Sequence, residues 1–297
     1  DLPPFANSAM DGFAIRAADT ILATTATPIA LRVSGESRAG VPSPDPVAAG
    51  HAARISTGAA MPTGTDAVIR LEDAAFDGTH MVVRDQVNAG HDVRPAGDDI
   101  RAGSVVVPAG TLLRAGEIAM LAAIGRTQVD VHRRARIAIL STGDELVPAG
   151  TPLGAGQIHE SNTPMLAALS EEQGAQLAQV RAGIGDTRAA TTEAIAGVLP
   201  DADIIVISGG ISKGEHDHVK PSLDALGVVA DFWQVAMRPG HPTWFGTVQT
   251  DGRRRLVFGL PGNPVSAYIA FQLFVAPALA GLMGHRRSAI ELPATYS

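Results

Sequence analysis

Glycine-rich turns that carry carboxylates follow several apolar runs in the second half of this 297-residue chain. The run Ile204–Ile207 leads into Ser208-Gly209-Gly210 and then into Glu215 and Asp217. Four β-branched residues in succession predict a strand that is buried on both faces of a sheet. Glycine lets the backbone amides after such a strand approach a ligand closely, because no Cβ intervenes. In open α/β sheets ligands bind at this carboxyl edge, so we expect the chemistry to lie here.

Three further turns have the same character: Ser141-Thr142-Gly143-Asp144-Glu145, Gly183–Asp186 and Gly259–Ser266. Each of the four turns follows a predicted strand, and three of them precede a predicted helix. Free amides and the positive end of a helix dipole at those three helix starts suit phosphate or another oxyanion. None of the turns matches the dinucleotide glycine fingerprint or the P-loop. Four such turns in one domain predict a shared ligand pocket.

Carboxylates in these turns, namely Glu145, Asp186, Glu215 and Asp217, predict a site for a Mg²⁺ ion that bridges phosphates. Hard cations of this kind prefer oxygen ligands. The alternative is that Asp186 and Asp217 are helix N-caps and that Glu215 is solvated. For Asp186 the two interpretations are equally good. Asp217 favours a functional role because it closes a glycine-rich turn.

Two cationic side chains, Arg238 and His241, flank a Pro-Gly turn. A cation there would complement an oxyanion seated at the helix start Gly262–Ser266. The alternative is an ordinary β-turn with exposed charges. His216 and His218 flank Asp217, but two loop histidines without further clustered ligands do not predict a transition-metal site.

Strands and helices alternate from about residue 132 onward, which predicts an α/β domain with a largely parallel sheet covered on both faces. The predicted strands are 136–140, 176–181, 204–207, 232–235, 243–247 and 256–258. The predicted helices are 163–173, 187–199, 219–226 and one that begins at Asn263-Pro264. For the second of these helices, Asp186 is a candidate cap.

Residues 1 to about 110 lack long helical periodicity, which predicts a small β-rich domain. The predicted strands there are 29–33, 53–56, 67–71, 81–83 and 104–107, and a short helix is predicted over Arg114–Ile124. Polar turns at Asn7–Gly12, Ser56–Gly58 and Gly97–Ile100 carry no physical sign that they belong to the α/β pocket. We therefore predict a multidomain α/β plus β-rich protein. Its parts are a β-rich region at 1–91, a connecting α/β segment at 92–131, a ligand-binding α/β domain at 132–285, and the start of a further β domain at 286–297.

Composition excludes several classes of function. The net charge of −7 argues against a general nucleic-acid or acidic-membrane surface. The absence of cysteine excludes disulfides, thiolate metal sites and a cysteine nucleophile, and it fits a reducing, cytoplasmic location. The uncharged stretch Val265–Met283 is long enough to span a membrane, but alanine and glycine dilute it, so we predict a helix buried in a soluble domain.

The motifs of the chain also resemble those of a known family, in family order and over nearly the whole sequence. They are Asn7-Ser8-Ala9-Met10-Asp11-Gly12-Phe13-Ala14, Arg54-Ile55-Ser56-Thr57-Gly58, Asp98-Asp99-Ile100, Ser141-Thr142-Gly143-Asp144-Glu145-Leu146, Ser161-Asn162, Ser208-Gly209-Gly210, Gly214 with Asp217, and Gly259-Leu260-Pro261-Gly262-Asn263-Pro264-Val265-Ser266. This set resembles the molybdopterin molybdenumtransferase family, which includes the C-terminal domain of gephyrin.

The resemblance implies Mg²⁺-dependent insertion of molybdate into adenylylated molybdopterin, with release of AMP and formation of molybdenum cofactor. It further implies a cytoplasmic homodimer whose active site is shared between subunits, with other molybdenum-cofactor biosynthesis proteins as partners and with neither nucleic acid nor membrane. The catalytic residues implied are Asp11, Thr57, Asp99, Glu145, Asp186 and Asp217, of which Asp217 and Glu145 are the expected Mg²⁺ ligands. The ligand-binding residues implied are Ser141, Thr142, Gly143, Ser208, Gly209, Gly210, Gly262, Asn263, Ser266, Arg238 and His241. The last three of these form the implied seat for molybdate.

The sequence departs from the family pattern in three places. Arg238-Pro239-Gly240-His241 stands where the family usually has Lys-Pro-Gly-Lys, and Lys213–His218 stands for the usual Val-Gly-Glu-Ala-Asp-Tyr. Arginine keeps a fixed charge, whereas histidine is charged only when protonated. We also expect the chain to lack the family's opening helical segment and most of its C-terminal β domain. The alternatives left open are a molybdopterin adenylyltransferase on the same α/β fold, a non-catalytic gephyrin-like scaffold, and tungstate in place of molybdate.

Overall fold

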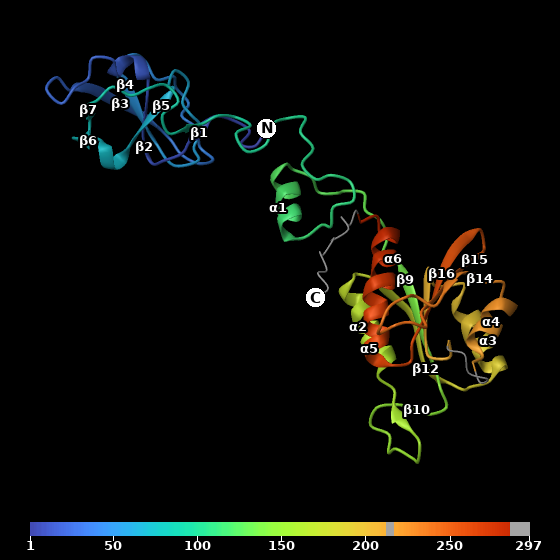
Figure 1. The fold of residues 1–297 in the computed structure, drawn as a ribbon. Helices are drawn as coiled ribbons and strands as arrows, with labels where there is room; N and C mark the ends of the chain where they lie inside the picture. Colours follow the sequence, from blue (N-terminus) through green and yellow to red (C-terminus); the bar gives the residue numbers. More distant parts are fainter. Residues whose placement is uncertain (212–216, 286–297) are drawn as a thin grey trace. The chain divides into compact units, whose positions relative to one another are not determined.

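A computed structural model describes residues 1–211 and 217–285 of the protein, and the chain divides into two compact units (Figure 1). Unit 1 comprises Asp1–Ala109 and Leu113–Val129, and unit 2 comprises Gly110–Leu112 and Asp130 onward. The fold class predicted from the sequence, an α/β domain preceded by a β-rich region, is confirmed. The predicted start of a further β domain at 286–297 lies outside the described residues, as do Lys213, Gly214, Glu215 and His216.

Unit 1 is built on a six-stranded sheet with the order β5-β2-β4-β3-β7-β6. The strands are β2 Gly12–Ile15, β3 Ile29–Ser37, β4 His51–Ile55, β5 Ala67–Arg70, β6 Ala75–Phe76 and β7 His80–Val83. A separate pair joins β1 Asn7–Ser8 to β8 Val93–Arg94, and the 3₁₀ turns are η1 Ala17–Thr20 and η2 Leu71–Asp73. Phe13, Leu31 and Met81 form the centre of the core, each with at most 1% of its surface exposed. Apolar side chains at alternate positions thus bury one face of this sheet.

One predicted strand of unit 1 is wrong and its predicted helix is confirmed. Residues 104–107 form no strand, and Val105 is 78% exposed, so its β propensity has no sheet surface on which to act. Helix α1, Ala115–Ala123, occupies the predicted segment. It stops before Gly125, whose φ of +76° is the left-handed conformation that ends many helices.

Unit 2 contains a six-stranded mixed sheet with the order β12-β9-β13-β16-β15-β14. Its strands are β9 Arg136–Thr142, β12 Gln176–Ile184, β13 Ile204–Ser208, β14 Val229–Trp233, β15 Trp244–Thr250 and β16 Arg253–Leu260. The first four strands in the sheet order run parallel, and β15 is antiparallel to both of its neighbours, β16 and β14. A small parallel pair, β10 Leu146–Val147 and β11 Ile158–His159, lies outside this sheet. The central strand β13 therefore has a parallel neighbour on each side.

Helices cover both faces of this sheet, as the alternation of strands and helices predicts. Successive side chains of β9 and β13 point to opposite faces of the sheet, so alternate residues pack in two different cores. Ile137 and Ile204 pack with α2, Asn162–Glu172, and with the C-terminal helix. Leu140 and Ile207 pack in the opposite core with α3, Arg188–Val198, and α4, Val219–Ala225.

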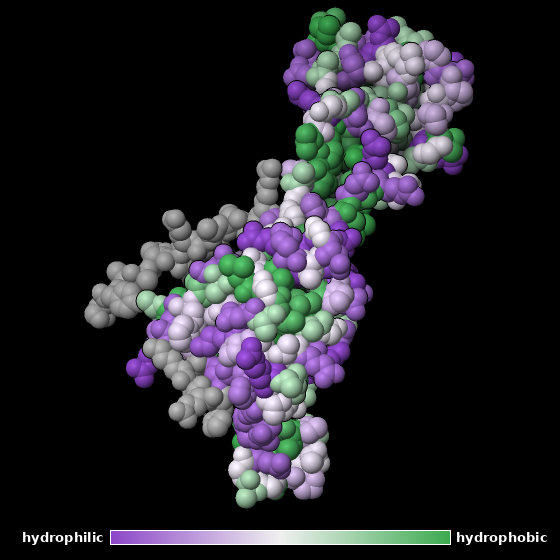
Figure 2. All heavy atoms as spheres, turned by 90° about the vertical axis from the view of Figure 1, so that its right-hand side faces the viewer, coloured by the Kyte–Doolittle hydropathy of each residue, from purple (hydrophilic) through white to green (hydrophobic). Residues whose placement is uncertain are grey.

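The C-terminal helix is the long apolar stretch of the sequence. It comprises α5 Pro264–Ala270, a π-helical turn Phe271–Val275 and α6 Ala276–Leu282. Among the described residues it alone is long and apolar enough to cross a membrane, which is weak support for a span. Its inner face, with Phe271 and Leu279 fully buried, packs on the sheet as predicted. Val265 and Leu273 stay exposed. On the face displayed in Figure 2, hydrophobic residues lie in groups and singly among hydrophilic ones.

Several element boundaries differ from the prediction, those of β14 and α2 among them. Strand β14 begins three residues earlier than predicted and stops before Gln234, whose φ of +68° breaks the extended backbone. Helix α2 starts at Asn162 with Ser161 as N-cap, rather than with Thr163. The Glu160 carboxylate accepts hydrogen bonds from the amide (2.8 Å) and the hydroxyl of Thr163.

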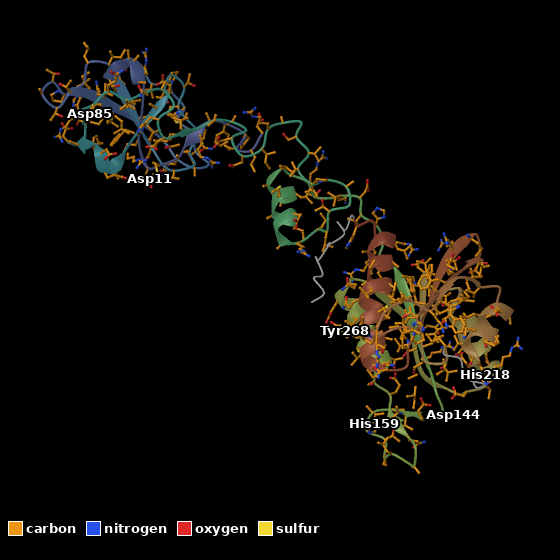
Figure 3. All side chains as sticks on the ribbon, viewed as in Figure 1. Asp11, Asp85, Asp144, His159, His218 and Tyr268 are labelled. Carbon is orange, nitrogen blue, oxygen red and sulfur yellow. The ribbon has the colours of Figure 1, made fainter. Side chains whose placement is uncertain are left out.

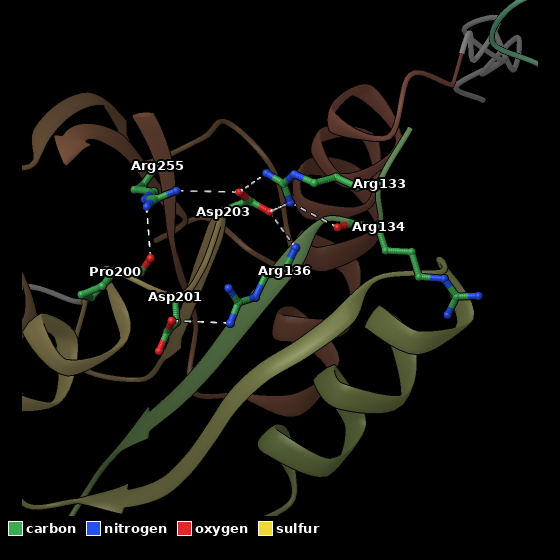
Figure 4. Close-up of polar contacts among 7 residues, drawn as sticks. All are labelled: Arg133, Arg134, Arg136, Pro200, Asp201, Asp203 and Arg255. Atoms are coloured by element: carbon green, nitrogen blue, oxygen red, sulfur yellow. Dashed lines mark hydrogen bonds and ion pairs between the residues drawn. The ribbon is translucent and has the colours of Figure 1, made fainter. Parts of the chain in front are cut away.

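An ion-pair network closes the amino edge of the sheet (Figure 4). Arg133 donates two hydrogen bonds to Asp203, at 2.6 and 2.7 Å, and the Arg136 amide donates a third at 2.8 Å. The guanidinium of Arg255, whose exposed fraction is 3%, lies 3.8 Å from Asp203 and donates to the Pro200 carbonyl at 3.1 Å. Burial raises the pKa of Asp203, but these donors outweigh it and hold the pKa below its ordinary value. The network fixes the edge opposite the candidate site.

Candidate functional site

The four predicted turns meet at the carboxyl edge of the sheet of unit 2. Parallel pairing puts Ser208 level with Ser141 and with Leu260, and Ile184 level with Thr142, so all four strands end at the same edge. An open pocket of about 540 Å³ lies there. Its lining residues are Thr142, Gly143, Glu145, Leu146, Ile158, Asn162, Asp186, Ser208, Gly209, Gly210, Asp217, Gly262, Asn263 and Pro264.

Ten of the predicted site residues therefore line one pocket. Ser141 does not line it, and its hydroxyl accepts a hydrogen bond from the Gly183 amide at 3.2 Å, which joins two of the turns. Leu146, Ile158, Asn162 and Pro264 line it without having been predicted as site residues. Figure 3 shows Asp144, His159 and His218 at this end of the α/β unit.

The Glu145 carboxylate folds back over Gly143. A Cβ on Gly143 would lie 2.6 Å from Glu145 Oε2 and 2.8 Å from Oε1, and the φ of Gly143 is +147°. Glycine at this position therefore lets the backbone turn and leaves room for the carboxylate above it. The glycine holds an acidic group at the pocket wall.

Asp186 is joined to Asp144 by two reciprocal hydrogen bonds. The amide of Asp186 donates to Asp144 Oδ1 at 3.0 Å, and the amide of Asp144 donates to Asp186 Oδ2 at 3.3 Å. The interpretation of Asp186 as a helix cap is wrong, because Thr187 caps α3 and its hydroxyl accepts from the Ala190 amide. The Asp186 side chain thus lines the pocket and ties two turns together.

Asp217 is the most strongly perturbed group of the site. Both of its carboxylate oxygens are buried, and at standard geometry neither has a hydrogen-bond partner among residues 1–211 and 217–285. Burial raises its pKa to about 6, although Lys220, the Val219 amide and His218 favour the charged form. The N-cap of α4 is His218, so capping does not explain Asp217. A buried carboxylate without a hydrogen-bond partner is stabilised when it binds a proton or a cation.

Helix starts at this edge are less open than predicted. The Asn263 carboxamide already accepts hydrogen bonds from the amides of Val265 and Ser266, at 3.1 and 3.3 Å. The Thr187 hydroxyl does the same for α3. The prediction of free amides is therefore wrong for these groups, because the capping side chains satisfy them first.

Arg238 and His241 lie in the loop between β14 and β15. Trp244, the first residue of β15, pairs with Gly259 near the end of β16, so this loop lies at the carboxyl edge too. Both side chains are exposed, neither lines the pocket, and His241 Nδ1 is 2.8 Å from the Val235 carbonyl. Ser266 does not line the pocket either. These three residues therefore lie at the same edge of the sheet as the pocket, but they do not line the pocket.

In unit 1 the three predicted polar turns gather around β1. The amide of Thr57 donates to Asp11 Oδ1 at 2.7 Å, and the amide of Gly58 donates to the Ser8 carbonyl at 2.8 Å. Arg94, on the partner strand of β1, donates to Asp99 at 2.6 Å. The side chains of Asp11, Thr57 and Asp99 are exposed, which leaves this cluster available to a ligand or a partner.

The donor set of the pocket fits a magnesium ion that shares its coordination with a substrate. Mg²⁺ in nucleotide sites usually takes one or two protein carboxylates and fills its octahedron with water and phosphate oxygens. Glu145, Asp186 and Asp217 line the pocket, and burial outweighs the nearby positive groups at Asp217, so its pKa is raised. No group of three or more acidic or histidine side chains that could hold a metal occurs among the described residues. A metal bound by this part of the chain would therefore need ligands from substrate or water.

Comparison with known proteins relates both units to one family. Residues 1–125 match a model described as the MoeA N-terminal region, domains I and II, and residues 138–281 match a probable molybdopterin binding domain. The chain is 36% identical to the molybdopterin molybdenumtransferase of Haemophilus influenzae, over 97% of this chain and 69% of that protein. It is 38% identical to molybdopterin molybdenumtransferase 2 of Mycobacterium tuberculosis, over 95% and 70% of the two chains. A crystal structure of the molybdopterin biosynthesis MoeA protein of Pyrococcus horikosii superposes with a TM-score of 0.80, at 34% identity, over 96% of this chain and 70% of that one.

Proposed function

Because the chain belongs to the molybdopterin molybdenumtransferase family and is thus a transferase of molybdenum-cofactor biosynthesis, we propose that it inserts molybdate into adenylylated molybdopterin. The reaction depends on Mg²⁺, releases AMP and yields molybdenum cofactor, in the cytoplasm. The observation that carries the proposal is the Asp217 carboxylate, whose buried oxygens have no hydrogen-bond partner at standard geometry among residues 1–211 and 217–285, in a pocket that Glu145 and Asp186 also line. Such a group suits a substrate that arrives with a phosphate-bound cation.

The central difficulty of this reaction is charge. Molybdate and the pyrophosphate-bearing dithiolene are both anionic and repel each other, so the protein has to hold them together. Mg²⁺, when bound to Asp217 and Glu145, supplies positive charge on the phosphoanhydride oxygens. Asp217 and Glu145 orient the phosphates, and Asp186 stiffens the wall through its bonds to Asp144.

The turns at the strand ends contribute backbone contacts to the ligand. Gly209 and Gly210 have left-handed φ values of +89° and +63°, and a Cβ on either would approach the Thr142 hydroxyl or carbonyl. Ser208, Gly143, Gly262 and Asn263 complete the walls. We assign the molybdate seat to Ser266, Arg238 and His241, the last two being the cations of the loop at this edge.

Asp11, Thr57 and Asp99 act, on this proposal, in the pocket of a second subunit of a homodimer. The support for this is that the three side chains are exposed in unit 1 and that Asp11 and Thr57 lie together. Mixing two inactive variants tests this. A dimer of Asp11→Asn with Asp217→Asn regains one intact site if the site is shared between subunits, whereas each variant alone stays inactive. Absence of regained activity in a verified mixed dimer rejects the shared site.

The reaction itself is tested by AMP release from adenylylated molybdopterin with molybdate and Mg²⁺. Wild-type protein should release AMP only when molybdate and Mg²⁺ are both present, and Asp217→Ala should lose both AMP release and cofactor yield. Wild-type rates in Asp217→Ala would refute the assigned role.

Tungstate in parallel reactions decides the oxyanion preference. Incubation with molybdopterin and ATP, without the adenylate, separates this function from an adenylyltransferase. A scaffold without catalysis would release no AMP at all.

A further inference from the structure

Asn162, which lines the pocket and opens helix α2, has a fixed amide orientation. Its Nδ2 donates to the Gly262 carbonyl at 2.7 Å and to Ser208 Oγ at 2.8 Å. A carbonyl oxygen only accepts hydrogen bonds, so the amide atom that faces Gly262 has to be the nitrogen. The Ser208 hydroxyl in turn donates to the Pro261 carbonyl at 3.5 Å, which leaves its oxygen free to accept. The orientation of Asn162 therefore follows from its partners.

The other amide atom, Asn162 Oδ1, is left without a partner. It is buried, and no donor reaches it from the described segments 1–211 and 217–285. Asn162 as a whole is 8% exposed. Its two nearest polar neighbours, Ser208 and Gly262, are both used by Nδ2.

The Thr142 hydroxyl is in the same condition. Thr142 lines the pocket, is 6% exposed, and its Oγ1 has no hydrogen-bond partner among the described residues. A Cβ on Gly210 would lie 2.8 Å from this oxygen, and one on Gly209 would lie 3.3 Å from it. The absence of a Cβ on these two glycines thus leaves space beside the buried hydroxyl.

Buried polar atoms without partners are rare in native proteins, because each costs about 1–3 kcal/mol relative to a satisfied one. Two of them on one pocket wall indicate that a ligand supplies the missing bonds. An amide oxygen carries negative partial charge and only accepts, so it disfavours phosphate or molybdate. The group that meets Asn162 has to carry an N–H or O–H donor.

We propose that Asn162 and Thr142 form a subsite that recognises a neutral, hydrogen-bond-donating edge of the substrate. The inference rests on the proposed function for the identity of the ligand. Two parts of adenylylated molybdopterin offer such an edge: the aminopyrimidinone of the pterin and the hydroxyls of the ribose. The carboxylates and cations of the site then bind the anionic parts of the substrate and their metal ion, and the Asn162–Thr142 subsite orients the neutral part.

Matched ligand pairs test the subsite in direct binding measurements. The first pair is pterin and lumazine, which differ in the exocyclic amine, and the second is AMP and its 2′,3′-dideoxy form. For the pair whose donor meets Asn162, wild-type protein should bind the donor-bearing member on the order of tenfold more tightly. In Asn162→Ala this ratio should fall to near one. The exposed neighbour Ser161, whose side chain makes no capping bond, supplies the control Ser161→Ala, which should keep the wild-type ratio.

Thr142→Val guards against a loss of fold. Because the hydroxyl has no partner within the described protein, its replacement by a methyl group removes no hydrogen bond of the fold, so Tm should stay the same or rise while ligand affinity falls. A change of ratio in the pterin pair identifies the pterin as the group bound, and a change in the AMP pair identifies the ribose. Unchanged ratios for both pairs in folded Asn162→Ala, or unchanged affinity in Thr142→Val, overturn the proposal. Since these are binding measurements, lack of AMP release would reject the proposed reaction and leave the subsite standing.

Discussion

Asp217→Asn should stabilise the α/β unit at neutral pH while it abolishes activity. The carboxylate of Asp217 is buried without a hydrogen-bond partner among the described residues, and its pKa is raised from 3.8 to about 6. An acid whose pKa is raised by folding holds its proton more tightly in the folded state than in the unfolded state. Its ionisation therefore lowers the stability as pH rises from the unfolded value toward the folded one, and above about pH 6 the loss is complete.

The size of the effect follows from the same values. The difference between 3.8 and about 6 corresponds to an upper bound of about 3 kcal/mol. Because the side chain is only half-buried, solvent screening reduces the expected effect to about 1–2 kcal/mol. The neutral amide of Asp217→Asn escapes this cost. The variant should thus exceed wild type by about 1–2 kcal/mol at neutral pH, and the difference should shrink toward pH 4 and vanish below the unfolded value of 3.8.

Urea unfolding followed by tryptophan fluorescence measures this difference in one unit of the protein. Both tryptophans of the chain, Trp233 and Trp244, lie in unit 2, so unfolding of unit 1 does not contribute. The measurement is made in EDTA. The matched control is Asp224→Asn, which changes an exposed carboxyl on α4, the helix that follows Asp217. A variant less stable than wild type at neutral pH, or a difference that does not shrink toward pH 4, would refute the reasoning.

Three further predictions concern other parts of the structure. Gly143→Ala should cut AMP release on the order of tenfold, because its Cβ would displace the Glu145 carboxylate. Gly150 also has a positive φ, +84°, but nothing lies within 4 Å of a Cβ placed there, so Gly150→Ala should keep wild-type kinetics. Equal losses in both variants would point to positive-φ backbone strain instead of contact with Glu145. Asp203→Ala should lower the free energy of unfolding by about 3–5 kcal/mol, because it leaves the buried Arg255 uncompensated. Asp201→Ala, which breaks an exposed pair at 3.5 Å, should cost less than about 1 kcal/mol in the same urea experiment. His241→Lys should bind molybdate more tightly than wild type at alkaline pH, because the ammonium of lysine keeps its charge whereas an imidazole is charged only when protonated. Equal affinities in calorimetric titrations would contradict the assignment of His241 to the molybdate seat.

Strand positions and the edge that carries the pocket could be predicted because they depend on local pattern. The β-branched run of β13 and the glycines that follow it have few alternative interpretations. The failure at 104–107 has the opposite cause: Val105 has β propensity, but no sheet surface lies beside it, which only tertiary structure reveals.

The site was harder to predict in its details. Asn162 at a helix start resembles an ordinary cap, and only its bonds to Ser208 and Gly262, 46 and 100 residues away in sequence, show that its oxygen is left over. The helix starts were also hard to predict. There the side chains of Asn263 and Thr187 accept hydrogen bonds from amides that we predicted to be free for a ligand. Hydrogen-bond satisfaction is a property of the folded neighbourhood, so residue types alone do not determine it.

The most direct test of the central claim is the ratio of molybdenum cofactor formed to AMP released by the chain. Adenylylated molybdopterin is supplied with molybdate and Mg²⁺, AMP is quantified, and cofactor is measured by reconstitution of a molybdenum enzyme that lacks it. The account predicts equal amounts of the two products, neither of which forms without molybdate. AMP released without molybdate, or without matching cofactor, would contradict it.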